Sequence, residues 1–177
     1  MRTLITNGTI VTADGSQAAD VLIDGETIAA IGSDLGGAGM SADATIDAAG
    51  RWVIPGGIDV HTHMELPFGG TFASDTFETG TIAAAWGGVT TIVDMPLNSI
   101  PPATSQRGVA EKAALTEGRV VVDVGLWGGA VPENTTGDPK GMKKLLEEGA
   151  RGFKCFLVPS GVDEFPNVDE ADLEAAL

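Results

Sequence analysis

The sequence predicts an α/β protein in which a small all-β segment is followed by strand–helix units with parallel strands. Residues 1–50 alternate apolar and polar side chains around Asn7-Gly8 and Asp24-Gly25, two dipeptides that are typical of hairpin turns. After this segment, apolar runs begin at positions 53, 89, 120 and 152. Because each spacing suits one strand, one helix and two loops, we expect four βα units. The predicted domains are therefore residues 1–50 and 51–177.

Start and stop signals mark the helices between these strands. Asp75 followed by Glu78 indicates a capping box, and Gly87-Gly88 indicates the end of that helix. A second helix is predicted over about 104–118. A third is predicted over 138–149, because Asp-Pro opens it and a glycine closes it.

The last predicted helix begins after Asp169 and contains no stop signal before Leu177. We therefore expect the chain to end within a helix. Four parallel strands fit either an open doubly wound sheet or half of a closed barrel, and the 177 residues are fewer than the roughly 200–250 of a complete (β/α)8 barrel. The pattern alone leaves both architectures open.

Charge and cysteine content restrict the partners. The chain has 10 Lys and Arg against 25 Asp and Glu, a net charge of −15, which argues against nucleic acid and anionic membranes. No apolar run approaches the roughly 20 residues that cross a bilayer, and the N-terminus lacks a secretory signal. A single cysteine, Cys155, cannot form an intramolecular disulfide. We expect a cytoplasmic protein with neither a nucleic acid nor a membrane as partner.

His61 and His63 are the two histidines of the chain, and they follow the first strand of the βα series. Alternate residues of an extended strand point to one face roughly 6.5–7 Å apart, so two imidazoles can converge on one metal ion. The alternative is a histidine pair satisfied by solvent or by the core. The strand end favours metal binding, because barrel enzymes carry their chemistry there.

Lys154 lies in the apolar run of the fourth strand, where a charged ammonium is costly to bury. A neutral amine can react with carbon dioxide to give a carbamate, whose two oxygens can bridge two cations. The alternative is a lysine with a buried stem whose amine reaches solvent. The neighbouring Cys155 is expected on the other side of the strand as a small apolar group, without a free histidine to serve nucleophilic catalysis.

Asp59 and Asp94 lie at strand ends, where a carboxylate can orient a ligating imidazole. A plain hydrogen-bonding cap of the strand end is an equally good interpretation of each.

Two motifs resemble the metal-dependent cyclic amidohydrolases: Pro-Gly-Gly-Ile-Asp-Val-His-Thr-His on the first strand and Gly-Phe-Lys-Cys-Phe on the fourth. Within that superfamily the chain is similar to allantoinase and its relatives, the dihydropyrimidinases or hydantoinases. The resemblance covers essentially the whole chain. It implies the N-terminal half of a (β/α)8 barrel, preceded by a segment of a small β-sandwich.

The resemblance also implies a two-metal site, usually zinc, in which His61 and His63 hold one ion and carbamylated Lys154 bridges both. A hydroxide activated by the two metals would then attack the carbonyl of a cyclic amide. The family supplies two further histidines from the fifth and sixth strands and a catalytic aspartate from the eighth. This chain has four βα units and no third histidine. We therefore expect that it contains no catalytic base, and that it is an inactive N-terminal fragment of a longer, homotetrameric enzyme.

Three segments bear on the substrate, and they do not agree. Residues 93–102 and 152–166 resemble allantoinase, whereas residues 63–81 are more similar to dihydropyrimidinases. The tyrosine that dihydropyrimidinases place shortly after the bridging lysine is missing, since the chain has no tyrosine, which favours conversion of allantoin to allantoate. Asn98 matches a position whose amide can bind substrate, although it also suits a turn. A noncatalytic scaffold protein is the remaining alternative, and the presence of all three predicted ligands argues against it.

Overall fold

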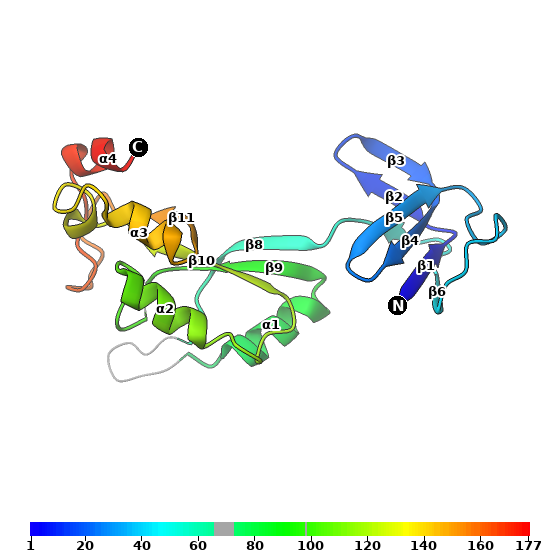
Figure 1. The fold of residues 1–177 in the computed structure, drawn as a ribbon, viewed down its shortest axis with the longest axis horizontal. Helices are drawn as coiled ribbons and strands as arrows, with labels where there is room; N and C mark the ends of the chain where they lie inside the picture. Colours follow the sequence, from blue (N-terminus) through cyan, green and yellow to red (C-terminus); the bar gives the residue numbers. More distant parts are fainter. Residues whose placement is uncertain (66–72, 98) are drawn as a thin grey trace. The chain divides into compact units, whose positions relative to one another are not determined.

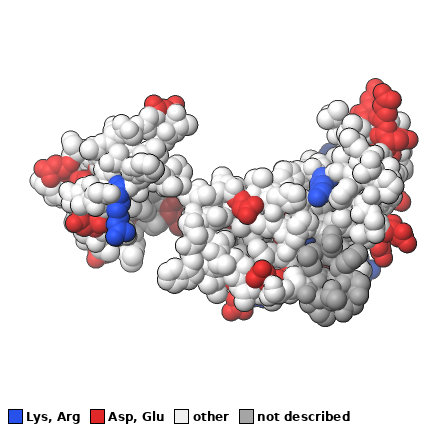
Figure 2. Space-filling model, turned by 180° about the vertical axis from the view of Figure 1, so that it is seen from behind, with Lys and Arg blue, Asp and Glu red and all other residues white. Residues whose placement is uncertain are grey.

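The computed structural model describes residues 1–65, 73–97 and 99–177. It divides into two compact units, Met1–Pro55 and Gly56–Leu177. The first is built of short strands and the second of alternating strands and helices, as the ribbon in Figure 1 shows. This order confirms the predicted α/β fold class, in which small β-sheets precede parallel βα units. Acidic side chains outnumber basic ones on the face drawn in Figure 2, as expected from the net charge of −15.

The first unit consists of two small sheets with strand orders β5-β4-β1-β6 and β3-β2-β7. Leu4, Leu22 and Leu35 form a buried cluster in this unit. The strands are β1 (Arg2–Thr6), β2 (Thr9–Thr12), β3 (Gly15–Ala18), β4 (Asp20–Asp24), β5 (Thr27–Gly32), β6 (Ala44–Asp47) and β7 (Trp52–Val53).

The two predicted hairpin turns have different outcomes. Gly25 has a φ of 62° and joins the antiparallel pair β4 and β5, so this hairpin is confirmed. Asn7 also has a left-handed φ of 60°, but β1 pairs with β4 and β6 whereas β2 pairs with β3 and β7. The prediction of a hairpin at Asn7-Gly8 is therefore wrong: the turn carries the chain from one sheet to the other. A Cβ atom at Gly8 would lie 2.6 Å from a methyl group of Val53, which explains the glycine.

The second unit is a parallel sheet with strand order β11-β10-β9-β8. Its strands are β8 (Gly57–Thr62), β9 (Val89–Asp94), β10 (Asp123–Gly129) and β11 (Ala150–Lys154), joined through the helices α1 (Phe77–Trp86), α2 (Gln106–Ala114) and α3 (Gly141–Glu147). A short 3-10 turn, η1 (Pro132–Asn134), precedes α3, and α4 (Glu170–Ala176) follows β11. Within the described ranges, β8 and β11 each pair with one strand, so both edges of the sheet are open.

Several element boundaries differ from the predictions by a few residues, and two of the differences have a clear structural cause. The run predicted to begin at position 53 is split, because Trp52–Val53 pairs with β2 of the first unit and β8 begins only at Gly57, after Pro55. The first helix is capped by Thr76 and Thr79 rather than by Asp75 and Glu78. Both threonine hydroxyls accept from a backbone N–H, that of Thr79 to Thr76 and that of Thr76 to Thr79, as the two side chains of any capping box do. The type of cap was therefore right and its register was off by one residue.

One face of this sheet is covered by α1, α2 and α3, and we call it the covered face. Its core joins Phe77 of α1, Val109 of α2, Leu126 of β10 and Leu145 of α3, all at most 6% exposed. Phe153 of β11 packs against the same cluster. The opposite side of the sheet is called the open face below, and it holds the residues that alternate with these.

Asp172 ties α4 to the turn after η1. Its carboxylate accepts hydrogen bonds from the hydroxyls of Thr136 at 2.6 Å and Thr135 at 2.8 Å, and these bonds lower its pKa. Because the folded pKa lies below the value of about 4 in an unfolded chain, the bonds stabilise the fold above that pH, and this contribution is lost as the pH falls through the folded pKa.

We therefore expect the free energy of unfolding to fall more steeply with acidification in the wild-type chain than in Asp172→Asn. Denaturant unfolding, followed by circular dichroism at neutral pH and below pH 4, measures the difference. Equal acid sensitivity of the two proteins would contradict this role of Asp172.

Candidate metal centre

His61 and His63 lie at the carboxyl end of β8, where the strand departs from regular pairing. Asp59 pairs with Ile92 and Thr62 with Asp94, so three steps along β8 match two along β9. This extra residue is a β-bulge, a feature that re-aims the side chains that follow it. The carboxylate of Asp59 stabilises the irregular turn, because it accepts a hydrogen bond from the backbone N–H of His61 at 3.0 Å.

The two imidazoles lie on the open face of the sheet. Thr62 bonds to Asp94, which is paired with Lys112 of α2, and Met64 packs against the core of the covered face. Since side chains alternate along an extended chain, His61 and His63 point to the other side. Their ring centroids are 5.4 Å apart, with an angle of 50° between the planes.

This geometry suits two ligands of one metal ion. Zinc–nitrogen bonds of about 2.0–2.1 Å at a tetrahedral angle place the centroids of two ligating rings roughly 5–6 Å apart. Nδ1 of His63 lies 2.7 Å from the backbone oxygen of Leu97. A carbonyl oxygen only accepts, so Nδ1 carries a proton, and the lone pair of the neutral imidazole is then on Nε2, where a metal can bind. The pair is therefore a chemically competent half of a metal site.

Lys154 is the last residue of β11 and pairs with Gly129 of β10. Because the preceding Phe153 packs on the covered face, Lys154 lies on the open face, the same face as the histidines. Its side chain is half-buried, and Nζ lies 4.8 Å from the ring centroid of Phe156. In the described ranges, no three His, Cys, Asp or Glu side chains gather as a metal site. The bridging role of Lys154 stays a prediction.

The other predicted residues have simpler positions. Asp94 accepts hydrogen bonds from the Thr62 hydroxyl at 2.9 Å and the Met64 N–H at 2.8 Å. Both Asp94 and Asp59 thus act as hydrogen-bonding caps of strand ends rather than as carboxylates bonded to an imidazole. The described partner of the His63 ring is the backbone carbonyl of Leu97. Cys155 is half-buried and free. Asn98 lies outside the described residues.

Two contacts around the centre were missed by the sequence analysis. Trp127 of β10 donates its indole N–H to the backbone oxygen of Val60 at 2.8 Å, which holds β8 just before His61. Lys112 forms a buried ion pair with Asp94 at 2.6 Å. The spacing of Lys112 three residues after Val109, on the apolar face of its helix, was the signal that could have indicated a buried lysine.

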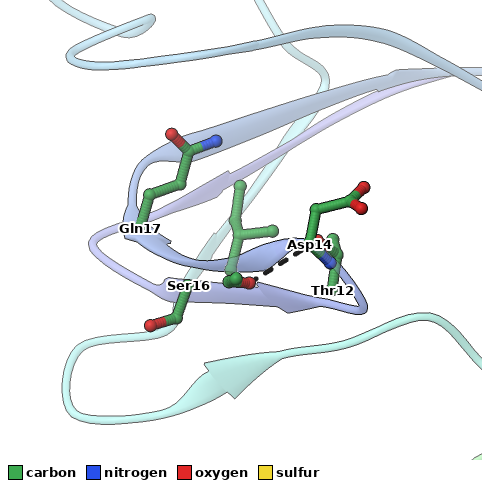
Figure 3. Close-up of a pocket in the computed structure, with 6 residues that line it drawn as sticks. Thr12, Asp14, Ser16 and Gln17 are labelled. Carbon is green, nitrogen blue, oxygen red and sulfur yellow. Dashed lines mark hydrogen bonds between the residues drawn. The ribbon is translucent and has the colours of Figure 1, made fainter.

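A cavity of about 270 Å³ lies elsewhere, at the hairpin of β2 and β3 in the first unit, and Figure 3 shows it. Its lining includes Thr12, Asp14, Ser16 and Gln17, and the backbone N–H of Asp14 donates to the Thr12 hydroxyl at 3.3 Å. This lining contains one carboxylate and no histidine, so the cavity lacks the paired imidazoles found at the end of β8.

Comparison with known proteins points to one family. Residues 52–167 match the Amidohydrolase family. The chain is 45% identical to a D-hydantoinase of Streptomyces coelicolor over 163 residues, which is 91% of the chain and 34% of that protein. It is 49% identical to a probable allantoinase of Dictyostelium discoideum over 128 residues, 71% of the chain and 24% of that protein.

The fold agrees with solved structures of the same group. A dihydropyrimidinase from Brevibacillus agri superimposes with a TM-score of 0.83 at 40% sequence identity, covering 100% of this chain and 37% of that structure. An L-hydantoinase from Arthrobacter aurescens gives a TM-score of 0.83 at 33% identity. The chain thus spans about a third of the length of the relatives it matches.

Proposed function

Because this chain belongs to the amidohydrolase family, we propose that it supplies the first ligands of a two-metal site that hydrolyses the C–N bond of a cyclic amide. The observation that carries the proposal is the His61–His63 pair on the open face, with its rings 5.4 Å apart and Nδ1 of His63 held by the backbone oxygen of Leu97. His61 and His63 would hold one divalent ion, most suitably Zn2+, since imidazole nitrogens suit that metal.

Lys154 would bridge this ion to a second one. Its amine adds to carbon dioxide, forming an N–C bond and releasing one proton, and the resulting carbamate offers two oxygens. The end of β11 supports this role, because Lys154 shares the open face with the histidines. When bound, the two ions would polarise the amide carbonyl and lower the pKa of a water molecule toward about 7.

The remaining contacts of the chain hold these ligands in place. Leu97 fixes the tautomer of His63 through its backbone oxygen, and Asp59 holds the bulge before it through the N–H of His61. Trp127 bonds to the backbone oxygen of Val60, which lies within the bulge. Each of these bonds orients a ligand without itself offering a lone pair to the metal.

Allantoin, opened to allantoate, is the substrate that we favour. The segments 93–102 and 152–166 and the absence of tyrosine support it, and several similar proteins are named allantoinase. Hydrolysis of a dihydropyrimidine or hydantoin is the second candidate, supported by the 45% identity to a D-hydantoinase over 91% of the chain. A noncatalytic scaffold is disfavoured by the presence of His61, His63 and Lys154.

The setting of the enzyme is part of the same proposal. We propose a homotetramer in the cytoplasm that acts on a small cyclic amide, with Asn98 contributing an amide to substrate binding. Among the described helices, none has both the length and the apolar character that crossing a membrane requires.

Substrate preference is tested in a protein that carries this chain together with the remaining units of an amidohydrolase barrel. We expect faster ring opening of allantoin than of dihydrouracil with added zinc, because the region after Lys154 offers no tyrosine hydroxyl to stabilise an oxyanion. Initial rates on both substrates under identical conditions measure the preference. Faster dihydrouracil cleavage would reassign the protein to the dihydropyrimidinases, and no turnover of either substrate would favour the scaffold alternative.

A further inference from the structure

We infer that Asp94, buried in an ion pair with Lys112, positions the histidine centre through its carboxylate oxygen Oδ1. This inference rests on the proposed function, in which His61 and His63 are metal ligands. Asp94 ends β9 and Lys112 lies on α2, and their side chains are 0% and 2% exposed, with Nζ 2.6 Å from Oδ2. Neither residue touches the open face. Their influence on the imidazoles runs through the backbone of the segment that carries them.

The other carboxylate oxygen of Asp94 holds that segment. Oδ1 accepts from the hydroxyl of Thr62 at 2.9 Å and from the N–H of Met64 at 2.8 Å. These two residues are the immediate neighbours of His63 in the chain. A single oxygen atom therefore anchors both sides of the residue that we assign as a ligand, and it does so from the covered face, opposite to the ring.

Lys112 balances the buried charge of Asp94 and also bonds to the segment that follows it. Besides its ion pair, its ammonium donates to the backbone oxygen of Met95. The N–H of Met95 in turn donates to the backbone oxygen of Thr62 at 2.9 Å, and the backbone oxygen of Leu97, two residues on, accepts from Nδ1 of His63. The segment 94–97 thus fixes both the backbone and the tautomer of His63.

Stability alone is a poor explanation for this pair. Burying two charges costs several kcal/mol in desolvation, and apolar residues of similar volume often replace a buried ion pair with no loss of stability. An apolar pair cannot replace the acceptor that Thr62 and Met64 share. Positioning can therefore be distinguished from packing. If Asp94 positions His63, an uncharged pair that keeps a hydrogen-bond acceptor at position 94 should preserve the orientation of the His63 ring, and an uncharged pair without that acceptor should not.

The test compares two double variants of the 177-residue chain. Asp94→Asn with Lys112→Met removes both charges and keeps a side-chain oxygen at position 94, whereas Asp94→Leu with Lys112→Met removes that oxygen as well. We expect similar unfolding midpoints for the two. Cobalt affinity should fall about tenfold or more in the leucine variant alone, the range seen when a group that orients a metal ligand is lost.

A second measurement tests the same role of Asp94 without a metal ion. Since His61 and His63 are the two histidines of the chain, long-range 1H–15N NMR of the metal-free protein at mildly alkaline pH reports their tautomers directly. We expect the Nδ1–H form of His63 in the wild-type chain and in the asparagine variant, and a mixture of tautomers in the leucine variant. If the leucine variant fails to fold, Thr62→Val against Thr62→Ser gives the same comparison for one of the two bonds.

The outcomes separate the two claims. Wild-type cobalt affinity and an unchanged His63 tautomer in the leucine variant would overturn the positioning role, and so would an equal loss in the asparagine variant. If His61→Ala and His63→Ala leave the cobalt affinity unchanged, the proposed metal site is wrong. The tautomer comparison then still shows whether Asp94 positions His63.

Discussion

Replacing His61 or His63 by alanine should lower the affinity of this chain for Zn2+ about 100-fold. A structural zinc site with four ligands is worth about 10–16 kcal/mol, or roughly 3 kcal/mol for each ligand, and about 1.4 kcal/mol corresponds to a factor of ten. Each alanine removes one of the two imidazoles of the chain, so binding through the remaining ring is weak. Competition against a chromophoric chelator gives the affinity, and the cobalt spectrum reports nitrogen ligation.

Cys155→Ser is the matched control for this experiment. A thiolate is a strong zinc ligand, and Cys155 is the one cysteine of the chain. We expect the serine variant to retain the affinity of the wild type. Loss of binding in the serine variant, together with unchanged binding in both alanine variants, would move the site from the end of β8 to the thiol and contradict the assignment.

The βα order was predictable because its signals are local. Gly87 ends α1, Ser105 and Asp169 lie at helix starts, and apolar runs recur at one-unit spacing, so each boundary was set by residues a few positions apart. The histidine pair was predictable for the same reason, since two residues on one strand share a face. Local rules were therefore sufficient for the elements and for the candidate ligands.

Features set by long-range pairing could not be predicted. The bulge in β8 depends on its register against β9, and the sequence of β8 contains no glycine between Ile58 and Thr62 to signal it. Asn7-Gly8 adopts the turn conformation that its residues favour. The hydrogen bonds of Asn7, however, go to Asp20 and Asp47, which are 13 and 40 residues away in the sequence, and such distant partners cannot be identified from the dipeptide. The Asp94–Lys112 pair likewise joins a strand to a helix through the core.

The missing ligands lead to the prediction with the largest expected effect. The resemblance to cyclic amidohydrolases implies two histidines and an aspartate beyond the four βα units, and this chain has no third histidine. In the described ranges, the sheet holds four parallel strands with open edges at β8 and β11, so the open face is not enclosed by further strands. The resemblance therefore leads us to expect that the groups that move protons during amide hydrolysis lie outside these four βα units.

We expect the 177-residue chain to show no hydrolysis of allantoin or dihydrouracil above the buffer rate, even with saturating zinc. General acid–base catalysis alone is worth about 10²–10⁴ in rate, and loss of metal activation removes more. A protein that joins this chain to the remaining barrel units of its relatives should hydrolyse its substrate, and His61→Ala or Lys154→Ala in it should abolish that rate. Turnover by the 177-residue chain that His61→Ala removes would overturn the argument, because two histidines and one lysine would then suffice for catalysis.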